Sequence, residues 1–196
     1  MQNDDLQDPD EIYVLQSAEQ IRALAASATH DAFIGLLTIG EGSIAQIAEV
    51  IQKTPHSLYH HIDKLLAVGL ILEAGERRSG ARTEKIYRPV AHLLEADQSN
   101  SDPDYLTALA DNSRAQHRRA GQAITDAFQK GWVKRKAGEE NLVSLQITVP
   151  LNEKQRQELV ARMNQLIDDF SSGLDADETA QGHLVTVSLA PLKPID

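Results

Sequence analysis

The segment TPHSLYHHIDKLLAVGLI, residues 54–71, decides the fold. Thr54 is a residue type that caps helices, and Pro55 suits a first helical position because its missing N–H costs little there. Apolar residues recur along the segment at spacings of four and three: Leu58, Ile62 and Leu65. Gly69 is typical of the residue after a helix end. The pattern therefore predicts an amphipathic helix over residues 56–68 with one buried face.

The neighbouring sequence supplies three further elements. Upstream, apolar residues at helical spacing between 44 and 51 predict a short helix, which residues 52–55 join to the next one by a turn. Downstream, the sequence predicts a strand at 70–72, a basic loop at 77–82 and a returning strand at 85–88. Two helices and a hairpin in this order can place the second helix in the major groove of DNA and the hairpin beside it.

The polar side of the 56–68 helix and the tip of the hairpin carry the candidate site. Donors and acceptors long enough to reach base edges gather near the N-terminal end of the helix: Thr54, His56, Ser57, Tyr59, His60 and Lys64. Recognition helices contact bases with this end. The hairpin adds three guanidinium groups, which suit phosphates and narrow minor grooves: Arg77, Arg78 and Arg82. We interpret these nine residues as a DNA-binding set; the alternative is a solvated surface without a partner.

The charge of the chain is unevenly distributed. The net charge is −10, and the first 20 residues hold six acidic side chains and no basic one. Residues 52–90 instead hold seven basic and four acidic side chains. Local charge steers a protein toward phosphate, so the acidic total does not exclude DNA binding.

Several classes of protein are excluded or disfavoured by composition. The chain has no cysteine, which excludes disulfides, thiolate metal sites and thiol catalysis. No apolar run approaches the roughly 20 residues that span a bilayer, and the acidic N-terminus does not resemble a signal peptide. We find no motif of a known catalytic centre. We therefore expect a soluble cytoplasmic protein that is not an enzyme and needs no metal or cofactor.

The domain organisation follows from these patterns and from a change of character near residue 95. We expect an α+β protein with four parts: an acidic tail at 1–16, a winged helix-turn-helix DNA-binding domain at 17–94, a linker at 95–102, and a dimerisation region at 103–196. Ser17 and Thr29 are expected to cap the first two helices of the domain.

The dimerisation region is expected to contain a long helix and a C-terminal strand–helix–strand module. The long helix runs from about residue 103 to 130, and strict alternation of apolar and polar residues predicts strands at 142–149 and 183–190. Asn152 caps the helix between them. The module is expected either to widen a dimer or to form a small-ligand pocket for an effector with the long helix.

The sequence resembles the winged helix-turn-helix of the ArsR-like bacterial repressor superfamily. The matching residues are those already singled out: 45–48, 54–65, 69–71, 77–82 and 86–89. The resemblance implies a homodimer that reads a near-palindromic operator on double-stranded DNA, usually as a repressor. It places the six helix residues named above against DNA, and it places His61 at a half-buried structural position.

Two departures from that family pattern bear on function. His30 stands where members commonly carry an arginine at the start of the second helix, so a phosphate contact is not expected there. Metal-sensing members use cysteine pairs, or sets of Asp and His on the last helix, whereas the long helix of this chain offers Asp111 and His117 without a second pair. We therefore reject the metal-sensor interpretation. The alternative function is a dimeric ligand-sensing or protein-binding winged-helix module that does not bind DNA.

Overall fold

The helix-turn-helix segment is the centre of the first of two structural units. A computed structural model describes residues 12–79, 82–171 and 184–190, with the backbone alone at Ser79, Arg82 and Ser171. The chain divides into units at residues 1–116 and 117–196, and the boundary falls inside the long helix α5 (Pro103–Gln129). The described part is a mixed α/β protein with six helices and two small sheets.

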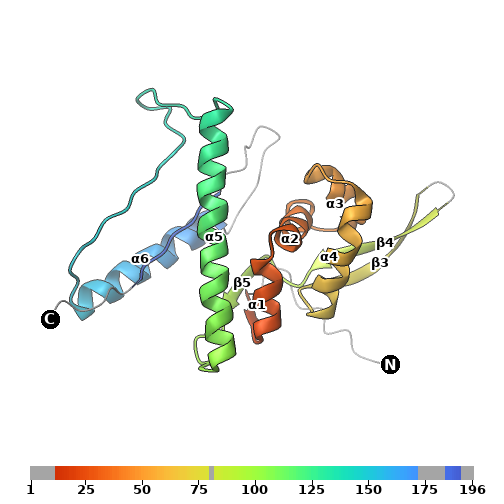
Figure 1. The fold of residues 1–196 in the computed structure, drawn as a ribbon, viewed down its shortest axis with the longest axis horizontal. Helices are drawn as coiled ribbons and strands as arrows, with labels where there is room; N and C mark the ends of the chain where they lie inside the picture. The colour runs from red at the N-terminus through yellow and green to blue at the C-terminus, as the bar shows by residue number, and fades with distance from the viewer. Residues whose placement is uncertain (1–11, 80–81, 172–183, 191–196) are drawn as a thin grey trace. The chain divides into compact units, whose positions relative to one another are not determined.

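The first unit has the element order of a winged helix (Figure 1). Its helices are α1 (Ala18–Ala25), α2 (Ser27–Ile39), α3 (Ile44–Val50) and α4 (Pro55–Ala67). Its antiparallel sheet has the order β2-β4-β3, formed by Gly42–Ser43, Arg82–Pro89 and Ile71–Ser79. The helix and hairpin predicted from residues 54–88 are thus confirmed, and both strands of the hairpin are longer than the sequence indicated.

Capping residues explain where two of these helices begin. The Ser17 side chain accepts a hydrogen bond from Gln20 N at 3.2 Å, and the Gln20 side chain reciprocates, which confirms the predicted cap of α1. Ser43 and Gln46 form the same arrangement at α3. The cap predicted at Thr29 is wrong, because α2 begins two residues earlier. Thr29 lies inside that helix and is only 1% exposed.

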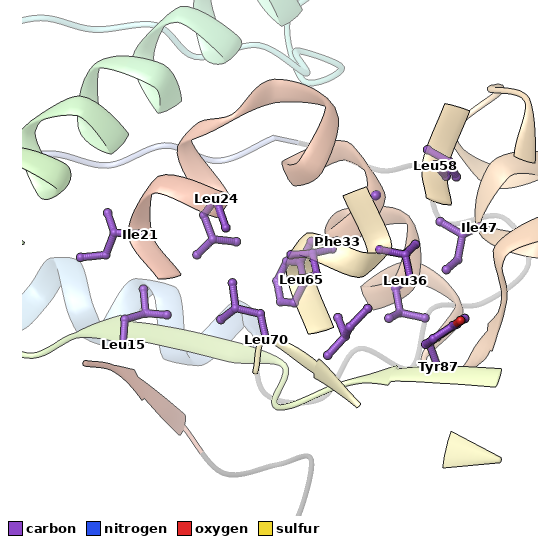
Figure 2. Packing of buried hydrophobic residues seen from close by; sticks show 14 of the residues in the cluster. Leu15, Ile21, Leu24, Phe33, Leu36, Ile47, Leu58, Leu65, Leu70 and Tyr87 are labelled. Carbon is purple, nitrogen blue, oxygen red and sulfur yellow. The ribbon is translucent and has the colours of Figure 1, made fainter. Parts of the chain in front are cut away.

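The core joins the four helices to the sheet (Figure 2). The predicted apolar face of α4 is buried, with Ile62 and Leu65 fully covered. These side chains pack in one cluster with Phe33 and Leu36 of α2, while Leu70 lies between α4 and the sheet. Burial of this kind contributes about 1.5–3 kcal/mol for each large apolar side chain. Because the apolar face of α4 is buried in this core, the polar side of the helix faces outward.

A second, two-stranded sheet was not anticipated from the sequence. Strand β1 (Ile12–Leu15) pairs in parallel with β5 (Leu93–Ala96). Residues 12–15 had been assigned to the acidic tail, and 95–96 to the linker. Residues 1–11 of that tail lie outside the described residues. Tyr105 of α5 secures the sheet: its hydroxyl donates to Leu15 O at 2.6 Å and accepts from Asp97 N at 2.7 Å.

The second unit contains the predicted helix but not the predicted strands. Helix α6 (Glu153–Ser171) forms, and Asn152 accepts a hydrogen bond from Gln155 N at 2.9 Å at its start. Residues 142–149 and 184–190 are not assigned as strands, so that prediction is wrong for the described residues. Alternation of apolar and polar residues indicates an extended segment with one apolar and one polar face, but a strand also needs a hydrogen-bonded neighbour. Neither segment has such a neighbour among the residues that the structure describes.

Candidate nucleic-acid interface

The outer side of α4 is exposed along its N-terminal half. Five predicted contact residues are classed as exposed: Thr54, His56, Ser57, Tyr59 and His60. Tyr59 is the largest of them and is 55% exposed. Lys64 lies farther along the helix and is half-buried. The structure therefore brings five of the six helix residues together on one solvated surface and leaves the sixth at its margin.

Two local hydrogen bonds shape the beginning of α4. Thr54 occupies the N-cap position, but its side chain makes no capping hydrogen bond, unlike the cap expected from its residue type. The backbone carbonyl of Thr54 instead accepts two hydrogen bonds from Ser57, one from its hydroxyl at 2.8 Å and one from its backbone N–H at 3.1 Å. The Thr54 hydroxyl is therefore not committed to capping the helix, and the Ser57 hydroxyl oxygen can still accept a hydrogen bond.

The turn before α4 holds a residue in an unfavourable backbone conformation. Gln52 has φ +55° and is the sole non-glycine residue with positive φ among those that the structure describes. Left-handed backbone of this kind costs an L-residue roughly 1–2 kcal/mol. The turn is closed by Lys53 N donating to Ala48 O at 2.9 Å, so α3 and α4 are held at a fixed crossing.

A buried contact ties α4 to the helix behind it. The Thr29 hydroxyl lies 3.0 Å from Nδ1 of His61, which is half-buried. This pair joins α2 to the middle of α4 and adds a directional contact to the apolar packing. His61 thus has a structural position, as the family resemblance implied, and it differs in this respect from its exposed neighbour His60. The role of Thr29 was missed because its partner lies 32 residues away in sequence.

Strands β3 and β4 form the wing, a hairpin that projects beyond α4 in Figure 1. Pairing extends to Ser79 and Arg82, so Arg77 and Arg78 lie in a strand and not in the predicted loop. The register shifts between Glu73 and Gly75, which marks a β-bulge. Gly75 has φ +132°, a conformation that side-chain-bearing residues rarely adopt. Bulges bend and twist a strand pair, so this one sets the direction of the wing.

The wing arginines differ in their surroundings. Arg77 Nη2 donates to Gln46 Oε1 at 2.6 Å, and the same oxygen accepts from Ser43 N at 3.0 Å. Arg77 thereby connects the wing to the start of α3. Arg78 is exposed, and its guanidinium makes no hydrogen bond or ion pair with any residue that the structure describes. The side chain of Arg82 lies outside the described residues.

One ion pair spans the base of the wing. Lys85 Nζ lies 2.7 Å from Glu73 Oε1, and both side chains are about half exposed. The hydrogen bond to Glu73 is the main reason that the pKa of Lys85 is raised above its ordinary value of 10.5. Lys85 therefore remains charged, and part of its charge is offset locally. Of the two arginines described near the tip of the wing, Arg77 is held by Gln46, whereas Arg78 remains exposed.

The residues that the structure describes contain no group of three or more His, Asp or Glu side chains placed to hold a metal ion. None of the helices within the described ranges is both long and apolar enough to cross a membrane.

Comparison with known proteins gives little further information. No protein-family model matches the chain, and no curated protein matches it. Among solved structures, a transcriptional regulator of the MarR family from Silicibacter pomeroyi is similar over 82% of this chain and 84% of its own, at 13% sequence identity and a TM-score of 0.28. A similarity at this TM-score carries no argument about fold or function, so both rest on the residues described above.

Proposed function

We propose that this chain is a sequence-specific DNA-binding transcriptional regulator of the ArsR-like winged-helix kind, acting as a homodimer to repress transcription from a near-palindromic operator. The observation that carries the proposal is the exposed polar N-terminal half of α4, held in the same folded unit as a projecting wing on which Arg78 is exposed. The family resemblance of residues 45–89 supports the same assignment.

The proposed division of labour follows from side-chain chemistry. Thr54, His56, Ser57, Tyr59 and His60 would face base edges in the major groove, where donor and acceptor patterns distinguish all four base pairs. Arg78 and Arg82 would grip the backbone or the adjacent minor groove. Lys64 would reach a phosphate from the margin of the helix, and Arg77 would mainly hold the wing against α3. Two recognition helices of a dimer would enter successive major grooves about 34 Å apart.

Substitution of Arg78 by alanine tests the phosphate contact. An operator is first selected from a random-sequence duplex library with the full-length protein, and binding is then measured by mobility shift at several salt concentrations. Arg78→Ala should weaken binding to selected and scrambled duplexes alike, because phosphate contacts carry no sequence information. Since a dimer loses two contacts, the slope of log affinity against log salt should become shallower by about 2.

Substitution of His56 by alanine tests base reading in the same assay. His56→Ala should reduce the preference for the selected operator by about 1–3 kcal/mol per lost base contact and should affect scrambled DNA much less. Lys134→Ala removes a charge from an exposed position in the second unit and serves as the matched control. Equal losses on both duplexes for all three variants, or a wild-type protein that shifts no duplex at low salt, would overturn the proposed function.

A further inference from the structure

Residues 143–149 of the second unit form an extended segment with an exposed apolar side. Val143 is 83% exposed, Leu145 87% and Ile147 77%. Figure 1 draws this stretch as a trace without a strand arrow, in agreement with the absence of a pairing partner among the described residues. Exposed strand-like segments with alternating apolar residues normally pair with another strand, because their backbone N–H and C=O groups lack hydrogen-bond partners and their apolar face is exposed to water.

The sequence of this segment reads nearly the same in both directions. It is VSLQITV, with Gln146 at its centre. If two copies pair antiparallel about a twofold axis at Gln146, Val143 lies opposite Val149 and Leu145 opposite Ile147. On the other face, Ser144 lies opposite Thr148, and Gln146 lies opposite its own copy. Every residue thus meets one of the same chemical kind, as an interface between identical surfaces requires.

The charge of the segment also suits self-association. None of the seven residues is ionisable, so antiparallel pairing places no like charges opposite one another. The β-branched residues Val143, Ile147, Thr148 and Val149 favour the strand conformation. A heterologous partner would need its own matching pattern, whereas a second copy supplies it automatically.

Helix α6 offers the cover that a two-stranded sheet needs. A pair of strands alone is marginally stable in water, and packing against a helix remedies this. Leu166 is 49% exposed and Phe170 75%, while no helix or strand of the described part packs extensively on α6. Packing of these α6 side chains against Val143, Leu145 and Ile147 would bury apolar surface that is exposed in the single chain.

We propose that residues 143–149 of two copies of this chain pair antiparallel about a twofold axis at Gln146, and that this strand pair is a dimer interface of the second unit. The inference deepens the proposed function by naming the surface through which the homodimer forms, but it does not depend on DNA binding. It makes specific one of the two expectations for the C-terminal module, namely that the module widens a dimer.

The absence of cysteine from the chain permits a direct test by disulfide crosslinking. In full-length Gln146→Cys, the two thiols would face each other across the axis, where paired Cα atoms lie about 4.5–5.5 Å apart and a disulfide can form. Ser144→Cys is the matched control on the same face. Its two copies would be offset by four residues, or about 14 Å, which a disulfide cannot span.

Mild oxidation followed by non-reducing electrophoresis should convert most of Gln146→Cys, and little of Ser144→Cys, to a covalent dimer. The double variant Ser144→Cys/Thr148→Cys should again crosslink, because residue 144 of one copy faces residue 148 of the other. Circular dichroism and sedimentation of the reduced variants establish that each is folded and has the association state of the unsubstituted chain.

Three outcomes would overturn the interface. These are a monomer at micromolar concentration, a dimer that crosslinks at none of these positions, and equal crosslinking of Gln146→Cys and Ser144→Cys. The second outcome would place the dimer contact elsewhere, for example on α5. A crosslinked dimer that binds no DNA would instead support this interface and refute the proposed function, so the two failures are distinguishable.

Discussion

Replacing Tyr105 by phenylalanine removes one oxygen from a buried junction of three segments. The hydroxyl donates to Leu15 O at 2.6 Å and accepts from Asp97 N at 2.7 Å, and Tyr105 is 1% exposed. Tyr105→Phe keeps the ring and its packing. The variant therefore isolates the hydrogen bonds that join α5 to β1 and to the turn after β5.

The size of the stability loss depends on whether Leu15 O and Asp97 N find other hydrogen-bond partners once the hydroxyl is removed. A buried group left without a partner costs about 1–3 kcal/mol, so two such groups would suggest a large loss. However, Asp97 N also lies 3.3 Å from Leu15 O, and these groups form a hydrogen bond with each other. They satisfy one another when the hydroxyl is removed. We therefore expect Tyr105→Phe to lower the free energy of unfolding of the first unit by about 1–2 kcal/mol.

Urea unfolding followed by far-ultraviolet circular dichroism measures this change, with the slope against urea expected to stay constant. Tyr13→Phe is the matched control. Tyr13 is half-buried, and its hydroxyl accepts from Gln20 Nε2 at 2.9 Å while that nitrogen also donates to Val68 O at 3.0 Å. Its loss should cost about 0.5 kcal/mol or less. A Tyr105→Phe variant no less stable than Tyr13→Phe would refute the assigned role of the buried hydroxyl.

Two further variants test electrostatics and backbone conformation. Asp104 forms an ion pair with Arg22 through two hydrogen bonds. The hydrogen bond from Arg22 is the main reason that the pKa of Asp104 lies below its ordinary value of 3.8. The ion pair therefore stabilises the folded protein fully above pH 3.8, and this stabilisation is lost as the pH falls through the lower pKa of the folded state. Asp104→Asn should therefore lower the thermal midpoint at pH 7, and this loss should shrink as the pH falls progressively below 3.8; a loss that stays constant over that range would contradict the pairing. Gly69 follows the end of α4 with φ +71°, whereas Gly121 lies within α5 with open space around it. In urea titrations, Gly69→Ala should destabilise the protein by about 1 kcal/mol and Gly121→Ala should stabilise it by about 0.5–1 kcal/mol. Effects of the same sign would be inconsistent with these two backbone conformations.

The elements that sequence predicts well here are those whose signals are local. The spacing of Leu58, Ile62 and Leu65 specifies which side of α4 is buried, and therefore which side is exposed, without knowledge of what covers it. Ser17 and Gln20 lie within one helical turn, so their reciprocal cap is also readable from sequence. For the same reason, the exposure of the candidate DNA-facing residues could be anticipated.

The features that sequence does not reveal depend on distant partners. Tyr105 bonds to Leu15 across 90 residues, and the short apolar run of β1 pairs with β5, a strand far along the chain that the sequence does not indicate as its partner. Thr29 has the chemistry of a cap, but His61 engages its hydroxyl instead. At residues 143–149 the local signal is clear, yet the neighbour that would complete a strand is absent from the described chain. Alternation specifies the faces of a strand, not the identity of its partner.

The candidate interface is fixed from three independent directions, which bears on how it could discriminate between DNA sequences. The core holds the inner face of α4, Thr29 holds His61, and Gln46 holds Arg77 of the wing. Each contact lies at a different part of the interface: beneath the inner face of α4, at the middle of α4, and between the wing and α3. DNA binding would then order side chains more than backbone, so the free-energy cost of ordering the protein on binding is small. A rigid frame also makes a wrong base costly, because the frame cannot shift to relieve an unpaired donor. Selectivity of the proposed regulator thus depends on Thr29 and Gln46 as well as on the residues that would face DNA.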